Sequence, residues 1–153
     1  MAEIKASIAI LLAACGLACA GPVAAGDLQL SRTDVTELTQ GNVGKPFWSL
    51  QAQCAGVFGA GYAYEIGRQR VRQANDDEAW GEAMLNDSVA RLQADRAIDH
   101  QAALDIAAQE VEYGRNQAKM ALQEGGTAPE GQWNLLRSAC LDVSEAYGKL
   151  SQR

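Results

Sequence analysis

Two apolar seams with helical spacing, each containing one cysteine, constrain the fold of this chain most strongly. The first seam consists of Phe47, Leu50, Cys54, Val57, Gly61 and Tyr64. The second consists of Trp133, Leu136, Cys140, Val143, Tyr147 and Leu150. Alternating steps of three and four residues place side chains on one face of an α-helix. We therefore predict two core-facing helices, each with a cysteine that points inward.

The ends of these two helices have their own sequence signals. We expect the first helix over residues 46–74, because Pro46 suits a first helical position. We expect the second over residues 128–150, because Thr127 and Glu130 have capping-box spacing. Beyond residue 45 the chain is rich in Ala, Gln, Glu, Leu and Arg and has no alternating β-branched run, so the predicted fold class is all-α.

The positions of Cys54 and Cys140 within these helices favour a disulfide bond. If the two helices run antiparallel, the heights of the cysteines along the bundle differ by roughly 3 Å. The bond would close a loop of about 85 residues, worth roughly 4 kcal/mol in the chain-entropy model.

The middle of the chain is predicted to form two further helices. Asn75 and Glu78 have capping-box spacing, which predicts a helix from about Asp76. Its apolar face contains Trp80, Met84, Val89 and Leu92. Arg96 and Asp99 then occupy the next core positions, so we expect a turn, with Asp99 capping the following helix. A turn at residues 86–88 is the alternative. We favour a small antiparallel bundle of four helices; three helices, with one long middle helix, is the alternative.

The first 25 residues have the pattern of an export signal. Residues 6–20 carry no charge, Lys5 precedes them, and Gly21 and Pro22 end the apolar stretch. Small residues before Gly26 suit cleavage after Ala25, and cleavage after Ala20 is the alternative. We therefore expect a periplasmic or secreted protein with no stable membrane span after cleavage.

Two other interpretations of this segment stay open. The sequence 12–15, LAAC, resembles a lipobox, in which Cys15 would be lipidated and would anchor the protein. An uncleaved N-terminal anchor is the second, because residues 6–25 have about the length of a bilayer span.

In an exported chain whose signal contains Cys15 and Cys19, the remaining pair, Cys54 and Cys140, would form one disulfide. An irregular lead-in over residues 26–45, rich in Ser, Thr, Gly and Asn, would precede a bundle domain over residues 46–153.

The first predicted helix contains a glycine-rich stretch that costs helix stability. Gly56, Gly59 and Gly61 each disfavour the helix by about 1 kcal/mol relative to alanine. Close approach of a neighbouring helix is one explanation. The other is a face, flanked by Phe58 and Tyr62, that binds a ligand or a partner.

Composition excludes several classes of function. The formal net charge is −6 and the pI is about 4.7, which excludes a general nucleic-acid binder. Glu3 and Lys5 are the charged residues of the first 25, so removing that segment leaves the net charge unchanged. The chain has one histidine, His100, and lacks phosphate-loop and nucleophile-elbow motifs. We therefore assign no catalytic residue, no metal site and no cofactor.

Our first functional hypothesis is a non-catalytic accessory protein that binds another envelope protein through the glycine-rich face or residues 27–45. The first alternative is a carrier that holds a small apolar ligand in a cavity beside Gly56, Gly59 and Gly61. A lipoprotein anchored through Cys15 is the second. A hydrolase would need two converging carboxylates, with Glu65 and Glu110 as candidates.

Overall fold

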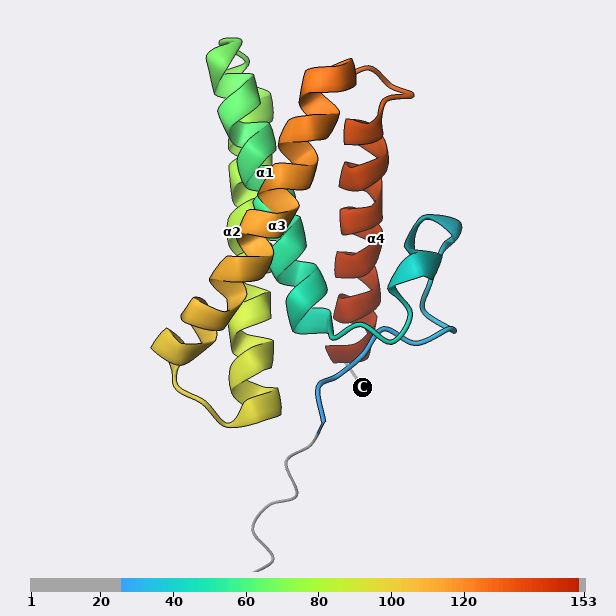
Figure 1. Ribbon diagram of the computed structural model, residues 1–153, viewed down its shortest axis with the longest axis vertical. Coiled ribbons are helices and arrows are strands. Elements are labelled where there is room, and N and C mark those ends of the chain that lie inside the picture. The colour runs from blue at the N-terminus through green and yellow to red at the C-terminus, as the bar shows by residue number, and fades with distance from the viewer. Residues whose placement is uncertain (1–25, 152–153) are drawn as a thin grey trace, which may run out of the picture.

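The computed structural model of the protein describes residues 26–151. The predicted export signal, with Cys15 and the cleavage sites after Ala20 and Ala25, lies outside the described residues. A short 3-10 helix, η1 (Glu37–Asn42), precedes four α-helices. They are α1 (Phe47–Gly67), α2 (Val71–Arg96), α3 (His100–Gly125) and α4 (Gln132–Ser151). Successive α-helices run in opposite directions (Figure 1), which confirms the predicted four-helix antiparallel bundle.

The first α-helix is the centre of the bundle. Side chains of α1 are buried along most of its length. It packs most extensively against α2 and α3, whereas α4 covers a third side with fewer contacts. This arrangement explains why α1 is apolar around most of its circumference, since a helix surrounded by others buries more than one face.

The boundary between α1 and α2 differs from the prediction. The single helix expected over residues 46–74 ends at Gly67, and α2 begins at Val71. Between them, Gln69 has a φ of 61°, in the left-handed region, and the N–H of Arg70 donates to the carbonyl of Glu65. Asn75 therefore lies inside α2 and does not cap it. The packing of Ala74, which is fully buried, holds the first turn of α2 on the bundle.

The turn between α2 and α3 confirms the prediction. The α2 helix ends at Arg96, and Ala97 has a left-handed φ of 52°. The Asp99 carboxylate accepts a hydrogen bond of 2.8 Å from the N–H of Ala102, as expected for a helix cap. Trp80, which we placed on the core face of this helix, is instead partly exposed and stacks on the buried Phe58.

The start of α4 also differs from the prediction. The helix begins at Gln132 and not near Ala128, so Thr127 and Glu130 do not form its capping box. The side-chain amide of Asn134 instead donates to the carbonyls of Thr127 and Ala128, at 3.3 and 2.6 Å. These bonds hold the preceding turn against the first turn of α4.

The lead-in over residues 26–45 contains the short helix η1 and is otherwise irregular, as predicted, and it packs against the bundle. Gln29 pairs with Pro46 in an isolated bridge. Leu30 is buried with Phe47 and with residues of α4. Arg96 Nη2 lies 2.8 Å from Asp27 Oδ2, which ties the lead-in to the end of α2.

The α1 and α3 backbones meet at two glycines. A Cβ atom on Gly56 would lie 1.9 Å from the carbonyl oxygen of Val111. A Cβ atom on Gly114 would lie 1.9 Å from the carbonyl oxygen of Gln53. Both positions therefore require glycine, and at Gly56 the close approach of a neighbouring helix explains the residue.

Candidate functional site

The structure does not bring the five residues of the predicted glycine-rich face together on one open surface. Gly56 faces α3, and Gly61 faces the ring of Trp133 and the Asp77 carboxylate. Phe58 is fully buried, whereas Gly59 and Tyr62 are half-buried. The space beside Gly56 and Gly61 is filled by backbone and by the tryptophan ring, so neither glycine borders an apolar cavity of the kind that a carrier would need.

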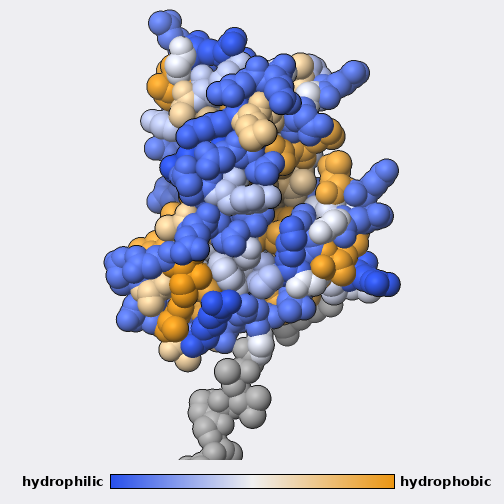
Figure 2. Space-filling model, in the orientation of Figure 1, coloured by the Kyte–Doolittle hydropathy of each residue, from blue (hydrophilic) through white to orange (hydrophobic). Residues whose placement is uncertain are grey.

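An apolar groove lies instead between α3 and α4. Its volume is about 200 Å³. Leu50, Cys54 and Val57 of α1 form its floor, and Leu136 and Val143 belong to its α4 wall. Figure 2 shows apolar surface in the hollow between the ridges of these two helices. The α3 and α4 helices contact each other at few positions, so a space stays open between them above α1.

Exposed apolar side chains lie on the two helices that form the walls of this groove. Tyr113 is part of its α3 wall and is 55% exposed. Met120, which is 59% exposed, follows Tyr113 on the same face after about two turns. On α4, Leu135 is 45% exposed and precedes the wall residue Leu136 in the sequence. Tyr113 therefore lines the groove, whereas Met120 and Leu135 are exposed apolar residues elsewhere on the two helices that form its walls.

The polar part of the groove comes from the lead-in, α1 and α3. Asn42 and Lys45 of the lead-in line it, and so do Gln53 of α1 and Gln117 of α3. Gln53 donates a hydrogen bond of 2.6 Å to Glu110 on α3. The lead-in was part of the predicted interaction surface, and two of its residues reach this site.

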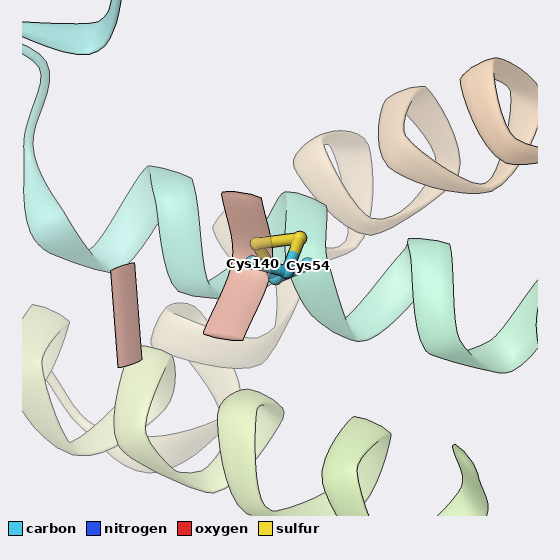
Figure 3. The surroundings of a disulfide bond; sticks show 2 residues. All are labelled: Cys54 and Cys140. Atoms are coloured by element: carbon cyan, nitrogen blue, oxygen red, sulfur yellow. A yellow bond between two sulfur atoms is a disulfide. The ribbon is translucent and has the colours of Figure 1, made fainter. Parts of the chain in front are cut away.

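The Cys54–Cys140 disulfide joins the floor of the groove to its α4 wall (Figure 3). The Cα atoms of the two cysteines are 5.3 Å apart, and both side chains are buried. The predicted disulfide is therefore present. The bond attaches α4 to α1 within the groove, because both cysteines are among the residues that line it.

A second, polar cavity lies where α1 ends and where α2 and α4 begin. Its volume is about 300 Å³. Glu65 and Asp77, both only 4% exposed, line it together with Arg70 and Arg137. Arg70 Nε lies 2.5 Å from Glu65 Oε2, and Arg137 Nε lies 3.4 Å from Asp77 Oδ1.

The surroundings of Asp77 in this cavity raise its pKa. Burial raises the pKa of Asp77 above 3.8, and the positive charge of Arg137 only partly opposes this effect. The negative charges of Glu65 and Asp76 raise the pKa of Asp77 further. The cavity is therefore an ion-paired cluster in which each buried carboxylate has its own arginine.

The two carboxylates considered for hydrolysis do not meet in one site. Glu65 lines the polar cavity, whereas Glu110 accepts a hydrogen bond from Gln53 beside the α3–α4 groove. Asp77, which accompanies Glu65, was not among the predicted candidates. Its position was accessible from the sequence, because counting back from the buried Met84 by about two turns reaches Asp77.

The part of the chain that the structure describes also bears on metal binding and on membrane spanning. No three His, Cys, Asp or Glu side chains within residues 26–151 are grouped so that they could hold a metal ion. His100 is exposed at the start of α3. Among the described helices, none combines the length and the apolar composition that a membrane crossing requires.

Comparisons of this chain with protein-family models, with curated proteins and with solved structures found no match.

Proposed function

We propose that this protein is an exported, disulfide-linked helical bundle that binds another protein of the cell envelope through the α3–α4 groove. The observation that carries the proposal is the apolar groove itself, which Tyr113 lines, together with the exposed Met120 and Leu135 on the two wall helices. Exposed apolar surface that is continuous over several side chains is typical of protein interaction sites. Aromatic and methionine side chains are enriched at such sites.

Export is supported by two independent features. The first 25 residues have the charge and small-residue pattern of a cleaved signal. The Cys54–Cys140 bond is also of a kind that persists mainly in oxidising compartments. Lipidation at Cys15 would change how the protein is anchored and would leave the groove unaffected.

The size of the groove favours a macromolecular partner over a small ligand. Pockets that enclose small molecules commonly have volumes of about 300–1,000 Å³. The groove has a volume of about 200 Å³, which is too small to enclose most such ligands. Protruding side chains beside a shallow groove instead suit a contact with a protein surface.

Affinity capture from the native envelope tests the proposal. The bait is the full-length protein, compared with a Tyr113→Ser/Leu135→Ser double variant and with Ile66→Ser as control. Ile66 is 43% exposed, close to the 45% of Leu135, but it lies near the end of α1, away from the groove. We expect the wild type and Ile66→Ser to recover the same partner, and the double variant to lose it. Equal recovery by all three, or by none, would contradict the proposal.

Export is tested separately by N-terminal sequencing of the secreted or periplasmic material. Cleavage after Ala25 predicts Gly26 as the first residue, and cleavage after Ala20 predicts Gly21. Retention of Met1 or a lipid-modified Cys15 would contradict cleavage at these sites.

A further inference from the structure

The lead-in covers one end of the α3–α4 groove. Leu50 and Val143, which line the groove, also belong to the buried cluster that contains Leu30 of the lead-in, which is 1% exposed. About one turn further along their helices, Phe47 on α1 and Ala146 on α4 belong to the same cluster. The apolar seam between α1 and α4 therefore continues past the groove, and Leu30 fills it there. Figure 1 shows the lead-in beside the lower part of α4 and the start of α1.

A group of side-chain hydrogen bonds at Asp27 holds the lead-in in this place. Arg96 on α2 donates to both carboxylate oxygens of Asp27, at 3.0 and 2.8 Å, and Trp48 Nε1 donates to Asp27 Oδ2 at 3.1 Å. The N–H of Leu28 donates to Asp95 Oδ2 at 3.0 Å. Charge-assisted and bidentate hydrogen bonds of this kind are stronger than neutral ones. We call these bonds the Asp27 clasp.

Other features of the lead-in favour local opening. Within residues 26–45, Leu30 and Thr39 are the buried side chains, and η1 is the one helix. Water reaches the clasp, since the side chains of Asp27 and Arg96 are 19% and 39% exposed. Segments with few buried apolar contacts and solvent-exposed hydrogen bonds open at a low cost in free energy. The Asp27 clasp is therefore a large share of what keeps the lead-in closed.

We propose that the lead-in is an autoinhibitory strap, which opens at the Asp27 clasp and so joins the seam under Leu30 to the α3–α4 groove. The proposal rests on the binding function proposed above, because it concerns the regulation of the same site. With the strap closed, a partner reaches the groove alone. With the strap open, the partner also reaches Phe47 and Ala146. The apparent affinity for the partner therefore depends on the fraction of molecules in which the strap is open.

Hydrogen exchange followed by mass spectrometry, on the purified disulfide-linked protein, tests opening at the clasp. Asp27→Ala removes the bonds with Arg96 and Trp48. Asp34→Ala is the matched control, because the side-chain bonds of Asp34 stay within the lead-in. We expect the amides of residues 28–34 to exchange at least about tenfold faster in Asp27→Ala, because the lost bonds involve a charged group. The amides of α3, and all amides of Asp34→Ala outside the lead-in, should exchange as in the wild type. Unchanged exchange of residues 28–34 in Asp27→Ala, or equal acceleration of α3, would overturn the proposal.

Binding of the apolar dye anilinonaphthalene sulfonate tests whether the strap covers the seam. Leu30→Ser removes the side chain that fills the seam, and Leu38→Ser, at a leucine of the same segment that is 45% exposed, is the control. Exposed apolar surface binds this dye and raises its fluorescence. We expect higher fluorescence than in the wild type with Leu30→Ser and with Asp27→Ala, and no increase with Leu38→Ser. Failure of either of the first two variants to raise the fluorescence would overturn the proposal.

Affinity capture then separates this proposal from the binding function. We expect Asp27→Ala to recover more of the groove-dependent partner than the wild type does, and Asp34→Ala to recover the same amount. Equal or lower recovery by Asp27→Ala would overturn autoinhibition and leave the binding function intact. Absence of a partner from every bait, together with faster exchange and higher dye fluorescence, would reject the binding function, whereas the opening of the strap would stand.

Discussion

Gly56 and Gly59 lie about one turn apart on α1, but their surroundings differ. A Cβ atom on Gly56 would collide with the backbone of Val111, whereas one on Gly59 would meet no atom within 4 Å. We expect Gly56→Ala to lower the free energy of unfolding by about 1–3 kcal/mol, because α1 and α3 must separate. We expect Gly59→Ala to raise it by about 0.5–1 kcal/mol, because alanine favours the helix.

Urea unfolding of both variants, with the disulfide intact, measures these changes. Effects of the same sign at the two positions would show that the close approach of α1 and α3 is not what requires glycine.

Asp77 makes the free energy of unfolding depend on pH, and the direction of its pKa shift determines the sign of that dependence. Burial raises the pKa of Asp77, so the folded state holds a proton that the unfolded chain releases above pH 3.8. The contribution of this group to stability therefore falls as pH rises from 3.8 through the raised pKa, and stays reduced at higher pH. Removal of the Asp77 carboxyl charge should change the free energy of unfolding least at low pH, where Asp77 is neutral in both states.

We expect the free energy of unfolding of Asp77→Asn, relative to the wild type, to increase as pH rises from about 4 to about 7. Asp27→Asn is the control with opposite sign, because the hydrogen bond with Arg96 lowers the pKa of Asp27. The stability of Asp27→Asn relative to the wild type should decrease as pH rises toward 3.8 and then level off above it. Urea unfolding at several pH values measures both trends, and a falling trend for Asp77→Asn would contradict the assignment.

At the scale of elements, the attachment of α4 depends on the disulfide. The bond joins residues separated by 86 positions, and the chain-entropy model gives it a value of about 4–5 kcal/mol. The α4 helix makes fewer contacts with α1 than α2 and α3 do. Loss of the disulfide should therefore loosen α4 before the other helices. We expect the Cys54→Ser/Cys140→Ser variant to unfold at lower urea concentration and to exchange the amides of α4 faster than those of α2.

Hydrogen exchange followed by mass spectrometry measures this difference, and chemical reduction of the wild type should reproduce it. Uniform acceleration across all four helices would mean that α4 is held as firmly by packing as the other helices are.

The sequence predicted those helices in which the spacing of apolar residues shows which side of the helix faces the core. The seams through Cys54 and Cys140 gave two core helices and their disulfide, and Asp99 marked the start of α3. The turn at residues 68–70 was missed because it contains neither glycine nor proline, and Gln69 adopts the left-handed conformation there. The polar cavity was partly accessible, since Asp77 falls on a core stripe.

The groove could not be predicted in the same way. Helical spacing shows which side chains face inward, but it does not determine how far α3 and α4 lie apart once both pack on α1. That separation depends on the close contact at Gly56 and Gly114, which positions α3, and on Trp133 against Gly61, which positions α4. Both contacts are properties of the assembled bundle.

At the scale of the whole molecule, the bundle combines a rigid centre with one open side. The α1 helix and its disulfide form a fixed floor, and α3 and α4 present apolar side chains above it. A partner that binds as we propose would meet a floor that is joined covalently to α4, which lowers the cost of ordering the site.

Site-specific photo-crosslinking in the native host tests the central claim, that the α3–α4 groove contacts another protein, most directly. A photoreactive residue replaces Leu135 in one variant and Ile66 in another, since the two positions have similar exposure. We predict one defined adduct with another protein from position 135 and none from position 66. Adducts of equal yield from both positions, or no adduct from position 135, would contradict the account.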